Sequence, residues 1–209
     1  MSSVQNLVTI HEVKDTQVLF SDELNEQINA SVREFVLSQD EKNQSHEYWA
    51  QNRNTDQQKA MRDNLVGKKA EYFAMKHLRE VHGFPDCPID LQKRIGFQKK
   101  WVIDLCYNNI DSRFPNVHVK ACLPWIKTCF RDYSWTFQFS NANKVGGRDT
   151  IFDGPDTDLV AFMLLDDFES PSATVKAIMP WGEVKKHLRD PKKRELKNIK
   201  KCSYYQDMV

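Results

Sequence analysis

Apolar residues recur with a helical period in the first part of the chain. From Leu24 to Val36 they return every fourth position, which predicts an amphipathic helix over 22–37. The polar stretch SQDEKNQSH at 38–46 is expected to link this helix to the next one. Before the helix, NLVTIHEV and TQVLF are short enough and apolar enough to predict two short strands.

A second, longer helix is predicted by its start and stop signals. Thr55 and Gln58 fit a capping box, and Gly83 stands where a helix would end. The residues between them are mostly good helix formers. FPDCPID at 84–90 follows and contains two prolines, which predicts a loop.

After this loop the period of the pattern changes to two. In FQKKWVIDLCYNN, apolar Ile103 and Leu105 share one face and Asp104 lies on the other. In NVHVKACLPW at 116–125, small apolar residues alternate with His118 and Lys120. About nine turn-prone residues separate the two runs, so we expect an antiparallel hairpin.

Three further strands are predicted downstream. They are YSWTFQFS, DLVAFMLLDD and VKAIMPW, and the second is continuously apolar, which indicates a central strand buried on both faces. A basic helix is expected from about Gly182. Helices, then strands, then a helix indicate a mixed α/β domain at 55–209, preceded by an extension at 1–54 that contains the amphipathic helix.

Composition narrows the class of protein. Forty per cent hydrophobic and 11% aromatic residues are enough for a folded core. The sequence has no run of 18 apolar residues and no secretory start, so we expect a cytoplasmic protein without a membrane span. The five cysteines form no CxxC pair and are odd in number, which favours free thiols in a reducing compartment.

Positive charge is concentrated near the C-terminus although the net charge is only +1. Residues 185–201 contain nine Lys or Arg, which predicts contact with a polyanion, and a solvated helix face is the alternative. KVGGRD at 144–149 is a flexible loop suited to a phosphate backbone, or an ordinary turn. The candidate phosphate contacts are Lys144, Arg148, Lys192, Lys193 and Arg194.

A carboxylate on the second helix is the first candidate for chemistry. Glu71 lies on or beside an apolar stripe that includes Ala74 and Leu78. A buried carboxylate needs a cation, a proton or a hydrogen-bond partner, and a pair with nearby Lys68 or Lys69 is the alternative to a functional role.

Four residues in this order resemble the motifs of the PD-(D/E)XK nuclease superfamily: Gly67 and Glu71 in LVGKKAEYFAMKHL, Asp104 in WVIDL, and Lys120 in HVKAC. The resemblance spans roughly 60–180. It implies a restriction-endonuclease-like α/β fold, in which helices flank a mixed central sheet, here with an N-terminal helical extension. It also implies that Glu71, Asp104 and the Val119 carbonyl bind Mg²⁺ or Mn²⁺, and that Lys120 is the catalytic lysine.

One position departs from the pattern of this superfamily. His118 stands where an acid is usual, and histidine is a poor ligand for Mg²⁺, which prefers oxygen. One interpretation is that His118 contacts the scissile phosphate or the attacking water. Alternatively, the site tolerates a manganese-like ion, or the site has degenerated. A structural histidine inside the fold is a further interpretation.

These observations predict a divalent-metal-dependent DNA endonuclease that hydrolyses phosphodiester bonds. A homodimer is a further expectation, because many relatives are dimers whose two sites cut two strands. One alternative is a catalytically inactive nuclease-fold module that binds nucleic acid or a partner protein. Another is a metal-independent enzyme in which His118 is the general base.

Overall fold

The computed structural model describes residues 7–43, 55–89, 91, 103–123, 150–167 and 169–187. The helices are α1 (Asp22–Asn43), α3 (Thr55–His82) and α4 (Trp181–Val184). The strands are β1 (Thr16–Leu19), β2 (Val117–Cys122), β3 (Leu159–Leu165) and β4 (Ser172–Pro180). Three 3₁₀ turns, η1 (Tyr107–Asn109), η2 (Thr150–Asp153) and η3 (Lys185–His187), complete this list. The predicted mixed α/β class is confirmed.

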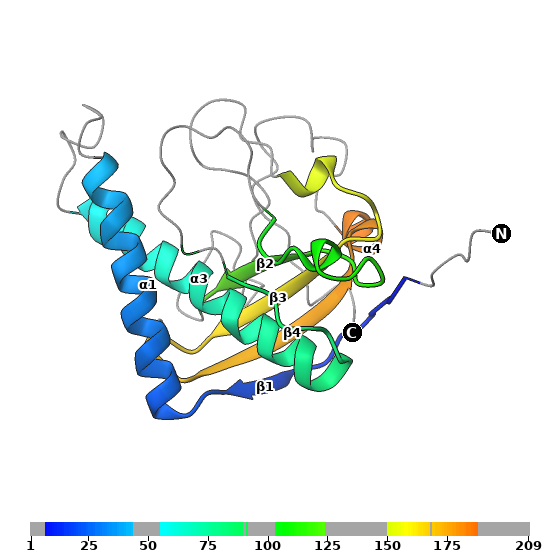
Figure 1. Cartoon of the computed structure of the whole chain (residues 1–209), viewed down its shortest axis with the longest axis horizontal. Coiled ribbons are helices and arrows are strands. Elements are labelled where there is room, and N and C mark those ends of the chain that lie inside the picture. Colours follow the sequence, from blue (N-terminus) through cyan, green and yellow to red (C-terminus); the bar gives the residue numbers. More distant parts are fainter. Residues whose placement is uncertain are drawn as a thin grey trace.

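The four strands form one mixed sheet in the order β1-β4-β3-β2. β2 and β3 are parallel, whereas β4 is antiparallel to both β3 and β1. β3 therefore lies inside the sheet and six of its seven residues are buried, as its continuous apolar sequence predicted. Figure 1 shows α3 lying across one face of this sheet with α1 beside it.

Each face of the sheet carries its own apolar cluster. On the face that α3 covers, which we call the α3 face, Phe73 packs with Ala161 and Met163 of β3. On the opposite face, which we call the Trp181 face, Trp181 packs with Val160 and Phe162. Successive residues of β3 alternate between the two clusters, as a pleated strand requires.

The end of α3 follows its sequence signals. Gly83 has a φ of 69°, and its N–H donates to the Arg79 carbonyl at 3.2 Å. A glycine takes this left-handed conformation without the steric cost that a Cβ imposes. The reversal places Phe84 against Tyr107 and Phe114, with ring centroids 4.8 and 4.7 Å away.

The N-terminal segment contributes to the same sheet and core. β1 pairs with β4 along the edge of the sheet, and α1 packs against α3 through buried residues that include Ile28 and Val32. The prediction of a linker at 38–46 is wrong for its first part, because α1 continues to Asn43. Gln39, Glu41 and Lys42 favour a helix by intrinsic propensity, and no proline or glycine ends it earlier.

The predicted hairpin is confirmed at one residue pair. Leu105 and Val117 form an antiparallel bridge, with N–H to O distances of 3.1 and 3.0 Å.

The expected strand at 133–140 lies outside the described residues, as does the basic segment beyond His187. In the described part of the chain, no helix is long and apolar enough to cross a membrane.

Lys69 on α3 should make stability depend on pH. The residue is 1% exposed, and burial lowers its pKa to about 8, although the charges of Glu169 and Asp167 oppose this shift. Between pH 8 and 10.5 the unfolded chain therefore holds a proton that the folded chain has lost. Folding is penalised in full below pH 8, and the penalty fades as the pH rises to 10.5.

We expect the free energy of unfolding of the wild type to rise, relative to Lys69→Met, by up to about 3 kcal/mol over this range. Urea unfolding of both proteins at pH 7.5 and 10 measures this difference. Lys76→Met, on the same helix but only partly buried, is the control and should show a smaller change. A difference between wild type and Lys69→Met that is the same at both pH values would contradict this account of Lys69.

Candidate functional site

Asp104 is fixed against β2 by a hydrogen bond to the backbone. Its Oδ2 accepts from the Val119 N–H at 2.8 Å, and the side chain is half-buried. In an extended strand the N–H and C=O of one residue point to the same edge. The Val119 carbonyl, which we expected to bind metal, therefore points to the edge of β2 where Asp104 lies.

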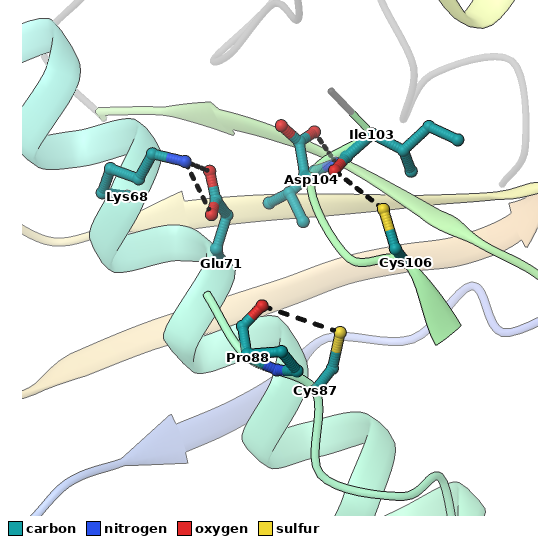
Figure 2. Close-up of polar contacts among 8 residues, drawn as sticks. Lys68, Glu71, Cys87, Pro88, Ile103, Asp104 and Cys106 are labelled. Atoms are coloured by element: carbon teal, nitrogen blue, oxygen red, sulfur yellow. Dashed lines mark hydrogen bonds and ion pairs between the residues drawn. The ribbon is translucent and has the colours of Figure 1, made fainter. Parts of the chain in front are cut away.

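Glu71 is buried on α3, at 4% exposure, and has a local cationic partner. Its carboxylate accepts two hydrogen bonds from Lys68 Nζ, at 2.8 and 3.0 Å (Figure 2). A partner of this kind is what a buried carboxylate requires. The pairing with Lys68, which the sequence offered as an alternative, is therefore present in the structure.

Cys87 and Cys106 connect the surroundings of Glu71 with the segment that carries Asp104. Burial raises the pKa of the Cys87 thiol; a backbone hydrogen bond from Cys106 opposes this, and the charges of Cys106 and Glu71 add to it. Cys106 follows Asp104 by two residues, and its Sγ donates to the Ile103 carbonyl at 3.4 Å. The region lies where α3 passes the 103–106 segment (Figure 2).

His118 and Lys120 lie on the other side of the sheet from Glu71. In the parallel ladder Lys120 pairs with Phe162 and His118 pairs with Val160, and both partners belong to the Trp181 face. Side chains of paired residues point to the same face of a sheet. The candidate lysine therefore leaves β2 on the face opposite to α3.

His118 is buried and faces Asp158, an acid that no motif in the sequence indicated. Its Nε2 lies 3.6 Å from Asp158 Oδ2, and both side chains are 5% exposed. Within the described residues neither atom has a hydrogen bond. Asp158 comes directly before β3, and its carbonyl accepts from the Trp181 N–H at 2.7 Å. Position before a buried strand was the only sequence signal for Asp158.

The five candidate phosphate contacts lie outside the described residues; they are Lys144, Arg148, Lys192, Lys193 and Arg194. At the start of the basic segment, Lys185 forms an ion pair with Asp156, and its Nζ lies 5.9 Å from the Trp181 ring centroid. Lys186 contacts Glu183 at 2.6 Å. These first two cations thus have acidic partners on the protein itself.

No protein-family model, curated protein or solved structure matches this chain. The mixed α/β class therefore rests on the structure alone.

Proposed function

We propose that this protein is a divalent-metal-dependent DNA endonuclease with a restriction-endonuclease-like fold. The observation that carries the proposal is the 2.8 Å hydrogen bond from the Val119 N–H to Asp104 Oδ2. It holds the aspartate of the suspected motif against the middle residue of His118-Val119-Lys120. Glu71, from a different element, is buried, and α3 carries it past the 103–106 segment that holds Asp104 (Figure 2).

The donor atoms in this region suit a hard cation. Glu71, Asp104 and the Val119 carbonyl offer oxygen only, which Mg²⁺ and Mn²⁺ prefer. Asp104 Oδ1 makes no hydrogen bond within the described residues, so one carboxylate oxygen is left for a ligand. Glu71 must turn from Lys68 or be shared with it. When bound, the ion supplies a Lewis acid for the phosphate and activates a water molecule.

The side chains of this region have distinct tasks in the proposed reaction. The Val119 amide fixes the orientation of Asp104 before substrate binds, which lowers the cost of assembling the site. Lys120 contributes positive charge to the anionic transition state. Because Lys120 leaves β2 on the Trp181 face, its long side chain must pass the edge of the sheet to meet a phosphate near Asp104.

One observation favours a second function, a nuclease fold that binds nucleic acid or a partner protein without cutting. His118, at the position of the usual acid, is buried beside Asp158. A histidine enclosed in this way is not positioned as a metal ligand beside Asp104. In such a module DNA binding would persist while hydrolysis would be lost.

Incubation of supercoiled plasmid DNA with the full chain tests the proposed function. We expect conversion to open-circular or linear DNA with Mg²⁺ or Mn²⁺ and intact plasmid with a chelator. A gel-shift assay with the chelator present measures binding separately. Binding without metal-dependent cleavage would support the non-catalytic module, and the absence of both would reject a nuclease and a DNA-binding role together.

A further inference from the structure

Glu12, His77 and His82 form a second cluster, separate from the region of Glu71 and Asp104. His77 Nε2 lies 3.0 Å and His82 Nε2 lies 2.7 Å from the same carboxylate oxygen, Glu12 Oε2. Their three ligand atoms all lie within 4.8 Å of one another. His77 is six residues beyond Glu71 on α3, a distance of about 9 Å along the helix axis.

Rigid elements hold the three side chains. Glu12 exchanges two backbone hydrogen bonds of 2.8 Å with Ile178 of β4, which fixes its place at the sheet. His77 is 2% exposed on the buried side of α3, and His82 is the last residue of that helix. The two histidines lie five positions apart, which is about 140° around a helix, so helical periodicity alone does not bring them together. The Glu12 carboxylate lies between the two imidazoles, and its Oε2 contacts both Nε2 atoms.

We propose that Glu12, His77 and His82 bind a zinc-class transition-metal ion through Oε2 and the two Nε2 atoms. Two imidazoles and one carboxylate are a donor set that Zn²⁺ takes, with a water molecule in the fourth position. Imidazole nitrogen also discriminates against Mg²⁺, which prefers oxygen. This assignment does not depend on the proposed nuclease activity.

The spacing between Glu12 Oε2 and each imidazole nitrogen requires only a small adjustment. Tetrahedral ligands with metal bonds of about 2.0–2.2 Å lie about 3.4 Å apart, so Oε2 and each nitrogen need to separate by roughly half an ångström. The outer part of the site is also built. Thr16 Oγ1 donates to the other carboxylate oxygen, Glu12 Oε1, at 3.2 Å, which orients Oε2 toward the imidazoles.

The two histidines also set the charge state of the Glu12 carboxylate. Burial raises the pKa of Glu12, but the hydrogen bonds and charges of His77 and His82 outweigh burial and hold it at about 2. Metal binding needs an ionised carboxylate and neutral imidazoles, so the ion would replace the protons that His77 and His82 share with Glu12.

A bound ion would join the segment before β1 to the C-terminal end of α3. It would bind the folded chain and not the dispersed ligands of the unfolded chain, so it would stabilise the fold. The side chains of Glu12 and His82 are 15% and 21% exposed, which leaves the site accessible from solvent.

The test uses the full chain after treatment with a chelator, titrated with ZnCl₂ and followed by calorimetry and thermal unfolding. We expect one equivalent of Zn²⁺ at this site and a higher melting temperature, with no competition from excess MgCl₂. His82→Ala and Glu12→Gln change partly exposed members, so both should fold, and each should lose that equivalent. Thr16→Val should weaken zinc affinity by about 10-fold or more.

His11→Ala is the matched control, because His11 is exposed and next to Glu12 in the chain. This variant should keep the equivalent and the gain in melting temperature. Zinc held by cysteines would persist in His82→Ala and in Glu12→Gln, so an unchanged stoichiometry in both overturns the proposal. No uptake of zinc by the wild type overturns it as well. Co²⁺ in place of Zn²⁺ should give the visible absorption of a tetrahedral site in the wild type and in His11→Ala, and should not give it in His82→Ala or Glu12→Gln.

Discussion

Replacing Asp104 by asparagine is expected to remove the proposed metal-dependent DNA cleavage while the protein stays folded. In the wild type the Val119 N–H donates to Asp104 Oδ2 at 2.8 Å. Asparagine keeps a carbonyl oxygen that accepts this hydrogen bond, so the pairing of Leu105 with Val117 should survive. It removes the negative charge that a hard divalent ion requires. We expect a loss of rate of at least about 10²–10³-fold, the size of one preorganised electrostatic contact.

Plasmid cleavage in Mg²⁺ and in Mn²⁺ measures this effect, and thermal unfolding checks the fold. Asp111→Asn is the matched control, because Asp111 is a loop carboxylate that bonds Arg113, at 2.6 Å, whereas Asp104 bonds the backbone of β2. This control should cut at the rate of the wild type. Equal rates for Asp104→Asn and Asp111→Asn would show that Asp104 is not part of a cleavage site.

Replacing His118 by aspartate is expected to destabilise the protein strongly. The variant has the acid that is usual at the corresponding position of the motif that this sequence resembles, but here the residue faces Asp158 in a buried setting. Two carboxylates enclosed together repel each other and lose their hydration. We expect the free energy of unfolding at pH 7 to fall by about 3–5 kcal/mol, as when a buried pair loses its partner.

His118→Asn separates the effect of charge from that of size. An amide is neutral and can donate to Asp158, so this variant should lose only about 1–2 kcal/mol. Urea unfolding of both variants at pH 7 gives the comparison. Equal stability of the two variants would show that position 118 accommodates an acid beside Asp158. That result would contradict the expected repulsion between the two carboxylates.

The sequence by itself determined the elements whose signals are local. The extent of α3 followed from a capping box and from Gly83, and the central position of β3 followed from its unbroken apolar run. The pattern in 116–125 predicted β2, and turn-prone residues before it predicted a hairpin, which the structure confirms at the bridge between Leu105 and Val117. Each of these signals acts within a few residues of the chain, where propensity and periodicity decide the conformation.

Tertiary structure alone decided which side chains meet. Spacing could place Lys120 and His118 on one face of a strand, but the parallel pairing of β2 with β3 decided that this face is the one opposite to α3. The pairing of His118 with Asp158 and the convergence of Glu12 with His77, 65 residues away, left no periodic trace in the sequence. Contacts of this kind depend on how sheet and helix pack together, because packing brings distant residues within bonding distance independently of their local preferences.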